Sequence, residues 1–212
     1  MRLALGCTLL ATLAGTFHAN PALAQAAPPQ PRMGAIAKDA MTEAQAKAAA
    51  DVERNGTVPA YLWPTLRNPG LTRPTQMIGE YLNREGKLPP RLTQMVILIV
   101  SKQLMYNGSW IEHSGMADRA GLSREITDAI AAGRRPGRMD EDETLVYDMC
   151  DELQKTMTIS DRTYTHAVAR LGEGGVVDTV AIVGFYGYLG LLNNATRLPM
   201  GVAPAFRPAP PR

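Results

Sequence analysis

The sequence has little cysteine and no large excess of charge of either sign, and these absences exclude several classes of protein. Its 212 residues include 2 cysteines, and 22 lysines and arginines stand against 20 aspartates and glutamates. So few cysteines exclude a disulfide-stabilised miniprotein, and 45% hydrophobic residues exclude a charge-dominated disordered chain. A net charge of +2 creates no field that favours nucleic acid or an anionic membrane. The composition therefore predicts a folded protein without a nucleic-acid partner.

Histidine is also scarce, and its spacing argues against a metal site. The chain has 3 histidines, at positions 18, 113 and 166. No two of them, and no two cysteines, stand at the two- or three-residue spacing of common zinc sites. We therefore expect no bound metal.

The N-terminus has the pattern of a secretory signal peptide. Arg2 supplies a positive charge, residues 3–17 are apolar or small, and small residues at 22–26 suit cleavage. A membrane-spanning helix is the alternative, but this run is short for the roughly 30 Å of a bilayer's hydrocarbon. We expect residues 1–26 to be a signal peptide, and the mature protein to be periplasmic or secreted and not held in a membrane.

After such a cleavage only one cysteine, Cys150, remains, so the fold must be held together by packing alone. Its neighbours, among them Val146 and Met149, fit an amphipathic helix and predict a buried thiol. A catalytic cysteine would need a nearby cation or histidine, and none is adjacent in sequence.

Proline marks both ends of the expected domain. Residues 27–37 form a proline-rich linker, and residues 199–212 hold five prolines in a segment that we expect to be a disordered tail. Between them, residues 38–198 are expected to form one domain, because no internal repeat of about 20–50 residues is visible.

Helix punctuation, with almost no two-residue alternation, predicts an all-α fold of about six to eight helices. The prolines at 89 and 90 open a helix whose apolar residues recur every three or four positions up to Leu104. Asp140 with Glu143 forms a capping-box pattern. The expected N-caps are Ser109, Ser123, Asp140 and Ser160, and the expected glycine stops are Gly86, Gly121, Gly133 and Gly172.

The last expected helix, from about residue 176 to 192, is apolar nearly all round. Such a helix has to be surrounded, and in a domain of this size another copy of the chain commonly helps to cover it. A membrane span is the alternative, but Asp178 lies in the first turns and the stretch is barely long enough. We therefore expect a homo-oligomer.

His113 is the more interesting of the two histidines that remain in the mature chain. Tyr106, Trp110, His113 and Ala117 recur at steps of four, three and four, and would share one face of an unbroken helix. Beside an indole and a phenol, desolvation favours the neutral imidazole, and a small substrate could be held there. The alternative is a hydrogen-bonded histidine of the core. Glu112 lies on a different side of the helix and is expected to be solvated.

Segments on several helices carry a resemblance to a known family. They are Leu88-Pro89-Pro90-Arg91 with Val96-Ile97-Leu98, Ser109-Trp110-Ile111-Glu112-His113, Ala120-Gly121-Leu122-Ser123, Ile159-Ser160-Asp161, and Val183-Gly184-Phe185-Tyr186 with Leu192-Asn193. Over roughly residues 60–199 the chain resembles the carboxymuconolactone decarboxylase and alkylhydroperoxidase D superfamily. The resemblance implies an all-α domain that assembles into trimers or hexamers.

Peroxidase members of that superfamily carry a Cys-x-x-Cys-x-x-x-His motif and a glutamate on the preceding helix. His113 matches the histidine, but Tyr106 and Ser109 replace the two cysteines and Gln94 replaces the glutamate. Without a thiolate no sulfur can attack a peroxide, and an amide cannot exchange the proton that a carboxylate would. Hydroperoxide reduction is therefore disfavoured.

Decarboxylase members act on a lactone acid from aromatic breakdown, and need no metal or organic cofactor. Such chemistry requires a proton donor or acceptor near the carbon that loses carbon dioxide. The resemblance implies His113 as this acid/base, with Tyr106 and Ser109 hydrogen-bonding the substrate, Trp110 forming a pocket wall and Gln94 contacting the substrate from the preceding helix.

The predicted function is therefore that of an exported, cofactor-free carbon–carbon lyase that decarboxylates a small carboxylated molecule or interconverts a lactone and an acid. The carboxylate of such a substrate also needs cations or amides to bind it. Arg119 and Arg197 are candidates, although the sequence favours a surface position for each. Two alternatives stay open. One is a peroxidase of the alkylhydroperoxidase type, and the other is a non-catalytic oligomer that binds a small ligand.

Overall fold

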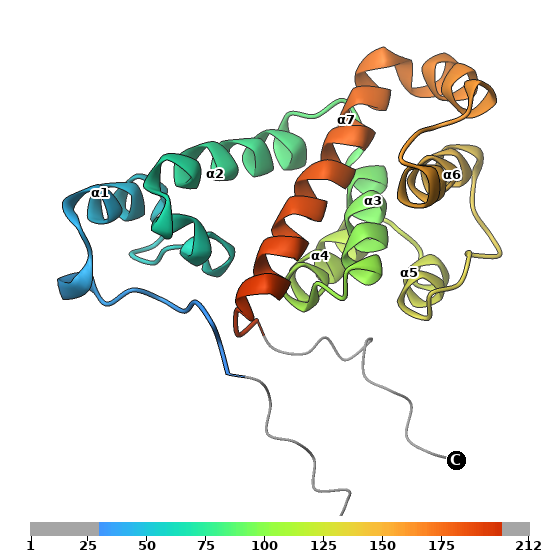
Figure 1. Cartoon of the computed structure of the whole chain (residues 1–212). Coiled ribbons are helices and arrows are strands. Elements are labelled where there is room, and N and C mark those ends of the chain that lie inside the picture. The colour runs from blue at the N-terminus through green and yellow to red at the C-terminus, as the bar shows by residue number, and fades with distance from the viewer. Residues whose placement is uncertain (1–29, 201–212) are drawn as a thin grey trace, which may run out of the picture.

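Helices make up the regular structure of the chain (Figure 1). The computed structural model describes residues 30–200, and within that range no strand is formed, which confirms the predicted all-α class. The predicted signal peptide at 1–26 and residues 201–212 of the predicted tail lie outside the described residues. The elements are the 3₁₀ helices η2 (Lys38–Ala40) and η3 (Ala60–Arg67), and the α-helices α1 (Glu43–Val52), α2 (Pro69–Arg84), α3 (Pro90–Gln103), α4 (Asn107–Arg119), α5 (Arg124–Ala131), α6 (Glu141–Thr156) and α7 (Asp161–Thr196).

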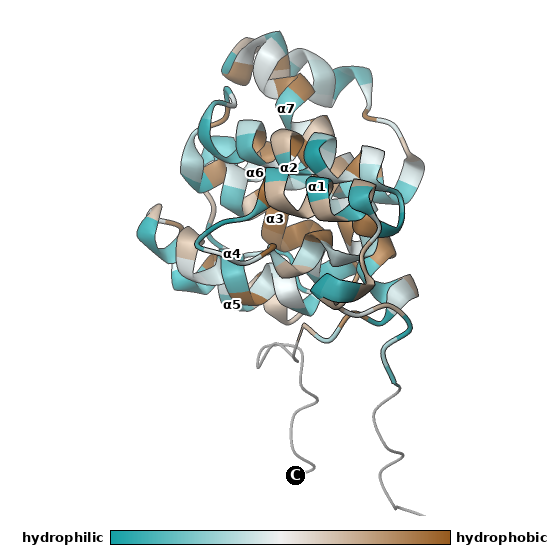
Figure 2. Ribbon diagram, turned by 90° about the vertical axis from the view of Figure 1, so that its left-hand side faces the viewer, coloured by the Kyte–Doolittle hydropathy of each residue, from teal (hydrophilic) through white to brown (hydrophobic). Residues whose placement is uncertain are grey.

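The central helix is α3, which the sequence predicted from its prolines and apolar spacing. Every residue from Leu92 to Ser101 is buried. Helices α4, α6 and α7 pack around it, and Figure 2 shows hydrophobic colour gathered on α3 while the outer turns are hydrophilic. Because α3 is fixed on several sides, the helices that contact it are held in place relative to one another.

Most of the predicted helix starts and stops are confirmed. Ser123, Asp140 and Ser160 are N-caps whose side chains each accept a hydrogen bond from the backbone N–H three residues on, and the capping box at Asp140 closes in both directions. Gly121 and Gly133 follow the ends of α4 and α5 at φ of 85° and 68°. That left-handed conformation favours glycine and ends a helix.

The predicted start of α4 was wrong. The helix begins at Asn107, so Ser109 lies within its first turn and Tyr106 is the N-cap residue. The Oγ atoms of Ser109 and Ser101 are 2.8 Å apart, so the buried Ser109 side chain bonds to α3 instead of capping α4. The helix therefore runs unbroken through Gly108, and Tyr106 and His113 are both buried on its inner side.

Helix α7 is long and bends once. At Gly172 the backbone leaves the helical region (φ 70°, ψ 167°), where the sequence predicted a stop. Before the bend the helix lies beside α6, and after it the helix runs along α3 (Figure 1). By length and composition alone α7 is a candidate membrane span, yet half of its most apolar window is buried inside the protein. We therefore describe it as a core helix with one uncovered face.

A second, smaller core lies at the N-terminal side of the molecule. Val52 of α1 and Leu62 and Leu66 of η3 are at most 1% exposed. Tyr61 packs against both this cluster and the central core, so the two are joined. At the end of α1, Arg54 and Thr57 pair through their backbones in a tight turn. This N-terminal part and α2 form one side of the cavity described next.

The predicted linker at 27–37 lies partly within the described residues and contacts the domain. The backbone N–H groups of Arg32 and Met33 both donate to the carbonyl of Thr196 at the end of α7. Arg67 of η3 donates to the carbonyl of Gly34 at 2.7 Å. Residues 32–34 are therefore attached to the helical core by hydrogen bonds.

Candidate functional site

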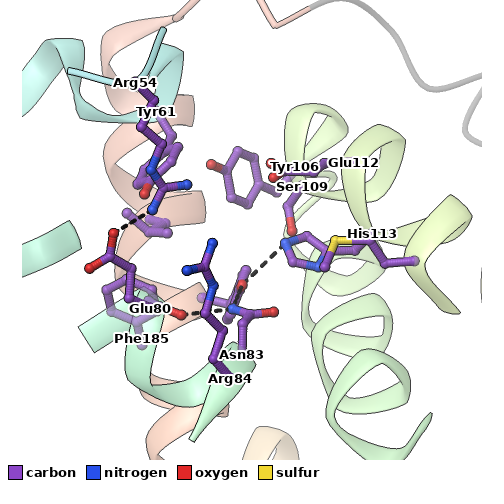
Figure 3. A pocket seen from close by; sticks show the side chains of 14 residues that line it. Arg54, Tyr61, Glu80, Asn83, Arg84, Tyr106, Ser109, Glu112, His113 and Phe185 are labelled. Atoms are coloured by element: carbon purple, nitrogen blue, oxygen red, sulfur yellow. Dashed lines mark hydrogen bonds and ion pairs between the residues drawn. The ribbon is translucent and has the colours of Figure 1, made fainter. Parts of the chain in front are cut away.

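A cavity of about 200 Å³ lies between α2, α4, α7 and the N-terminal part of the chain (Figure 3). Pockets for drug-sized ligands usually measure about 300–1,000 Å³, so this one suits a small guest. Its lining consists of Arg54 and Tyr61 from the N-terminal part, Gly79, Glu80, Asn83 and Arg84 from α2, Tyr106, Ser109, Glu112, His113 and Met116 from the start and body of α4, and Phe185, Tyr186 and Leu189 from α7.

His113 lies in the wall of this cavity as a neutral imidazole. It is only 5% exposed, and burial lowers its pKa to about 4. Its Nδ1 is 2.8 Å from Oε1 of Gln94, and its Nε2 is 3.1 Å from the hydroxyl of Tyr186. Because an amide oxygen only accepts, Nδ1 carries the proton and Nε2 presents its lone pair to Tyr186. The site therefore holds a base whose free nitrogen points at a tyrosine hydroxyl.

His113 and three other side chains, those of Gln94, Asn83 and Tyr186, form a closed ring of hydrogen bonds. Asn83 donates to the Tyr186 hydroxyl at 2.9 Å, and Gln94 donates to Oδ1 of Asn83 at 3.3 Å. Tyr186 thus accepts from Asn83 and gives its own proton to Nε2 of His113. The two rings meet edge to face, with centroids 5.2 Å apart, and burial raises the pKa of Tyr186. The ring fixes the tautomer of His113 and holds the hydroxyl of Tyr186, which lines the cavity, between Asn83 and Nε2 of His113.

Two of the predicted substrate-binding residues, Tyr106 and Ser109, line the cavity together with His113. The Tyr106 hydroxyl accepts from Asn193 of α7 at 3.3 Å, and burial raises its pKa. Both residues are 3% exposed, so a guest would meet only the parts of them that face the cavity.

The other two predicted substrate-binding residues, Trp110 and Gln94, do not line this cavity. Trp110 lines a separate surface hollow between α4 and α5. Successive helix residues are about 100° apart, so Trp110 falls to one side of His113 while Ser109 and Met116 fall to the other, cavity side. Gln94 is 3% exposed and lies behind the imidazole, where it orients His113 and does not line the cavity.

Glu112 is exposed, as predicted, and it also lines the cavity, which was not predicted. Desolvation raises the pKa of its carboxyl, while the charge of Arg54 acts in the opposite sense. The sequence placed Glu112 away from the assumed Tyr106–Trp110–His113 face. Once the cavity is known to lie on the Ser109 side of the helix, Glu112 falls next to it.

Two arginines and a glutamate at the cavity were missed from the sequence. Nη2 of Arg54 is 2.6 Å from Oε1 of Glu80, and this hydrogen bond is the main reason that the pKa of Glu80 is lowered. Arg84 lies one turn further along α2 and also faces the cavity (Figure 3). These side chains come from the N-terminal part and α2, far in sequence from His113, and no motif links them. The suggested carboxylate holders, Arg119 and Arg197, do not line the cavity.

The remaining chemistry-bearing residues lie away from the cavity. Cys150 is fully buried in α6, as predicted, and burial raises the pKa of its thiol. His166 is exposed on α7, with Nε2 3.2 Å from a Glu141 carboxylate oxygen. Among residues 30–200 no cluster of three or more histidine, cysteine, aspartate or glutamate side chains suits a metal ion.

Comparison with known proteins gives no family for this chain. No family model matches it, and no curated protein matches it significantly. The function must therefore be inferred from the cavity and its residues.

Proposed function

We propose that this protein is an exported, cofactor-free enzyme of the carboxymuconolactone decarboxylase type. It carries out acid/base chemistry, either decarboxylation or lactone/acid conversion, on a small carboxylated molecule. The observation that supports this most is the neutral imidazole of His113 in the cavity wall, bonded through Nε2 to the hydroxyl of Tyr186. A base of this kind can exchange protons with a guest without a metal or an organic cofactor.

In a decarboxylation the bond between carbon and carboxylate breaks, carbon dioxide leaves, and the electron pair left on carbon takes up a proton. Tyr186 delivers that proton from its hydroxyl, and the imidazolium form of His113 returns one to the tyrosine oxygen. Water replaces the proton on His113, so the reaction consumes one proton overall. The negative charge of a bound carboxylate favours this protonation of His113, which burial alone opposes.

The test is turnover of a panel of lactone acids by the purified mature protein, measured by chromatography and by release of carbon dioxide. We expect His113→Ala to abolish turnover, a loss of at least about 100-fold for a positioned acid/base, while helical content is retained. His166→Ala is the matched control and should leave turnover unchanged, because His166 is exposed on the far part of α7. Equal activity in wild type and His113→Ala would contradict the proposal.

Binding without conversion is the second candidate, and one observation favours it. Both ring nitrogens of His113 are already hydrogen-bonded, which is also the arrangement of a structural histidine. This candidate predicts saturable binding of a lactone acid, seen as a shift in melting temperature, and a ligand that mass spectrometry recovers unchanged. Recovery of a product excludes it.

A further inference from the structure

Arg84 is a positively charged residue at the cavity. It is exposed, lies in the last turn of α2, and lines the cavity. Figure 3 shows its guanidinium directed between the Arg54–Glu80 pair and His113. Within the described part of the chain it makes no hydrogen bond or ion pair, although its charge contributes to lowering the pKa of Glu80.

The neighbouring carboxylate is already neutralised by other arginines. Glu80 accepts from Arg54 at 2.6 Å through Oε1, and its Oε2 is 3.5 Å from Arg73. Two guanidinium groups therefore hold one carboxylate, and the charge of Arg84 is left without a direct counterion in this cluster. The other acid of the cavity is Glu112, and the charge of Arg54 acts to lower its pKa against the effect of burial.

Arg84 stands beside the hydrogen-bonded ring in sequence as well as in space. Its predecessor, Asn83, is the residue that donates to the Tyr186 hydroxyl. Asn83 thus orients the hydroxyl of Tyr186, and the next residue, Arg84, presents its guanidinium to the cavity. A guest held by Arg84 would have its reacting part near Tyr186.

We infer that Arg84 is the residue that binds the carboxylate of the guest, and that the acid group of the substrate therefore lies on the α2 side of the cavity. This inference deepens the proposed function and depends on the same cavity. A guanidinium suits the task because it offers parallel N–H donors to both oxygens of a carboxylate, which an ammonium group does not.

The experiment compares the binding of acids with that of their neutral amides by isothermal titration calorimetry. The probes are benzoate against benzamide, and γ-butyrolactone-γ-carboxylate against its amide, with the full mature chain. A charge-assisted bidentate contact should make the wild type prefer each acid by about tenfold or more. We expect Arg84→Gln to remove this preference and Arg84→Lys to keep part of it.

The matched control is Arg119→Gln, an exposed arginine on α4 that does not line the cavity, and it should bind as wild type. Because Arg84 is exposed and unbonded in this part of the chain, Arg84→Gln should keep the wild-type melting temperature. A wild type that does not prefer acids, or an Arg84→Gln variant that prefers them as strongly as wild type, would overturn the inference.

The outcomes also separate this inference from the proposed function. Acid-selective binding that depends on Arg84, with no turnover of any lactone acid, would contradict the enzyme and support the carboxylate site. Turnover that depends on His113 but keeps the same KM in Arg84→Gln would support the enzyme and contradict the carboxylate site.

Discussion

At the scale of single residues, His113 combines two properties that are seldom found together. It is almost completely buried and yet borders an open cavity, so desolvation keeps it neutral while a guest can approach its hydrogen-bonding partner. Gln94 holds Nδ1 and Tyr186 holds Nε2, which leaves the imidazole one tautomer. A histidine fixed in this way is ready to accept a proton only in the direction of Tyr186.

The variant Tyr186→Phe, which lacks only the hydroxyl oxygen, tests whether His113 exchanges protons through Tyr186. In Tyr186→Phe the hydroxyl between Nε2 and the cavity is lost, so we expect kcat to fall by about 100-fold to 10,000-fold with little change in KM. The hydrogen bonds lost to Asn83 and His113 should lower the free energy of unfolding by about 1–3 kcal/mol. Steady-state kinetics and urea denaturation measure the two effects.

Tyr164→Phe is the control for that substitution, since Tyr164 lies on the same helix but is 46% exposed. It should leave kcat and stability unchanged. Full activity in Tyr186→Phe would show that protons do not pass through this hydroxyl.

The lowered pKa of His113 also predicts how stability depends on pH. The folded-state pKa of about 4 lies below the unfolded value of about 6.5, so between them the unfolded chain binds more protons. The free energy of unfolding should therefore fall as the pH drops from about 6.5 to about 4, by up to about 3 kcal/mol from this residue. Above pH 6.5 its contribution is constant.

Urea denaturation at several pH values, for wild type and His113→Gln, isolates this contribution from that of the carboxylates. The stability difference between the two proteins should shrink steadily over that range as the pH falls. A difference that stays constant with pH would mean that His113 is not held neutral by burial.

At the scale of helices, the sequence was sufficient for most elements because their signals are local. Caps at Ser123, Asp140 and Ser160, and the left-handed glycines after α4 and α5, depend on residues within one turn. The start of α4 was wrong for a reason that is not local, since Ser109 is occupied by Ser101 of α3. Contacts between helices override such local preferences.

In the site, too, the local features could be predicted from the sequence and the contacts between helices could not. Tyr106 caps α4, and Ser109 and His113 lie on it. Spacing pointed to Tyr106 and His113, and the resemblance added Ser109. Spacing did not reveal that Glu112 lines the cavity and Trp110 does not, because it gives the relative positions of side chains on a helix but not which side faces a cavity. That side is set by how α2 and α7 pack, which one sequence does not reveal.

The bend in α7 gives a prediction at this scale. Gly172 has φ 70° and ψ 167°, a conformation that side chains with a Cβ rarely adopt. We expect Gly172→Ala to lower the free energy of unfolding by about 1–3 kcal/mol. The control is Gly115→Ala in α4, an exposed helical glycine where the added methyl group would contact only the flexible Arg119 side chain and should stabilise the helix by up to about 1 kcal/mol. Thermal denaturation of both variants checks this, and a neutral Gly172→Ala would contradict the strained geometry.

At the scale of the whole molecule, the N-terminal cluster and the central core meet at the cavity. The central core supplies His113 and Tyr186, and the N-terminal part with α2 supplies the charged side. No motif in the sequence marks that charged side, whose residues lie far from His113 along the chain. Residues far apart in the chain become neighbours only through the packing of α2 against α7.

One face of α7 is apolar and uncovered, and we expect other copies of the chain to cover it. Its exposed residues recur every three or four positions, and are Val177, Val180, Gly184, Tyr188 and Leu191. A soluble monomer rarely leaves such a stripe open to water. Light scattering coupled to size-exclusion chromatography should therefore give the mass of a trimer or hexamer.

Val180→Asp places a charge in the middle of that stripe and should shift the mass towards that of one chain. Thr165→Asp, at an exposed position on the part of α7 before the bend, is a control remote from the stripe and should keep the assembly. A wild type that elutes as a monomer would contradict the expected oligomer.

The central claim is that His113, through Tyr186, exchanges protons with a carboxylated guest, and hydrogen exchange tests it most directly. The mature protein is incubated in deuterium oxide with γ-butyrolactone-γ-carboxylate, and the loss of the proton signals beside its carbonyl groups is followed by nuclear magnetic resonance. We predict exchange that exceeds the buffer rate in wild type and His166→Ala, and falls to the buffer rate in His113→Ala and Tyr186→Phe. Exchange at the buffer rate in wild type, or exchange that persists in His113→Ala, would contradict the claim.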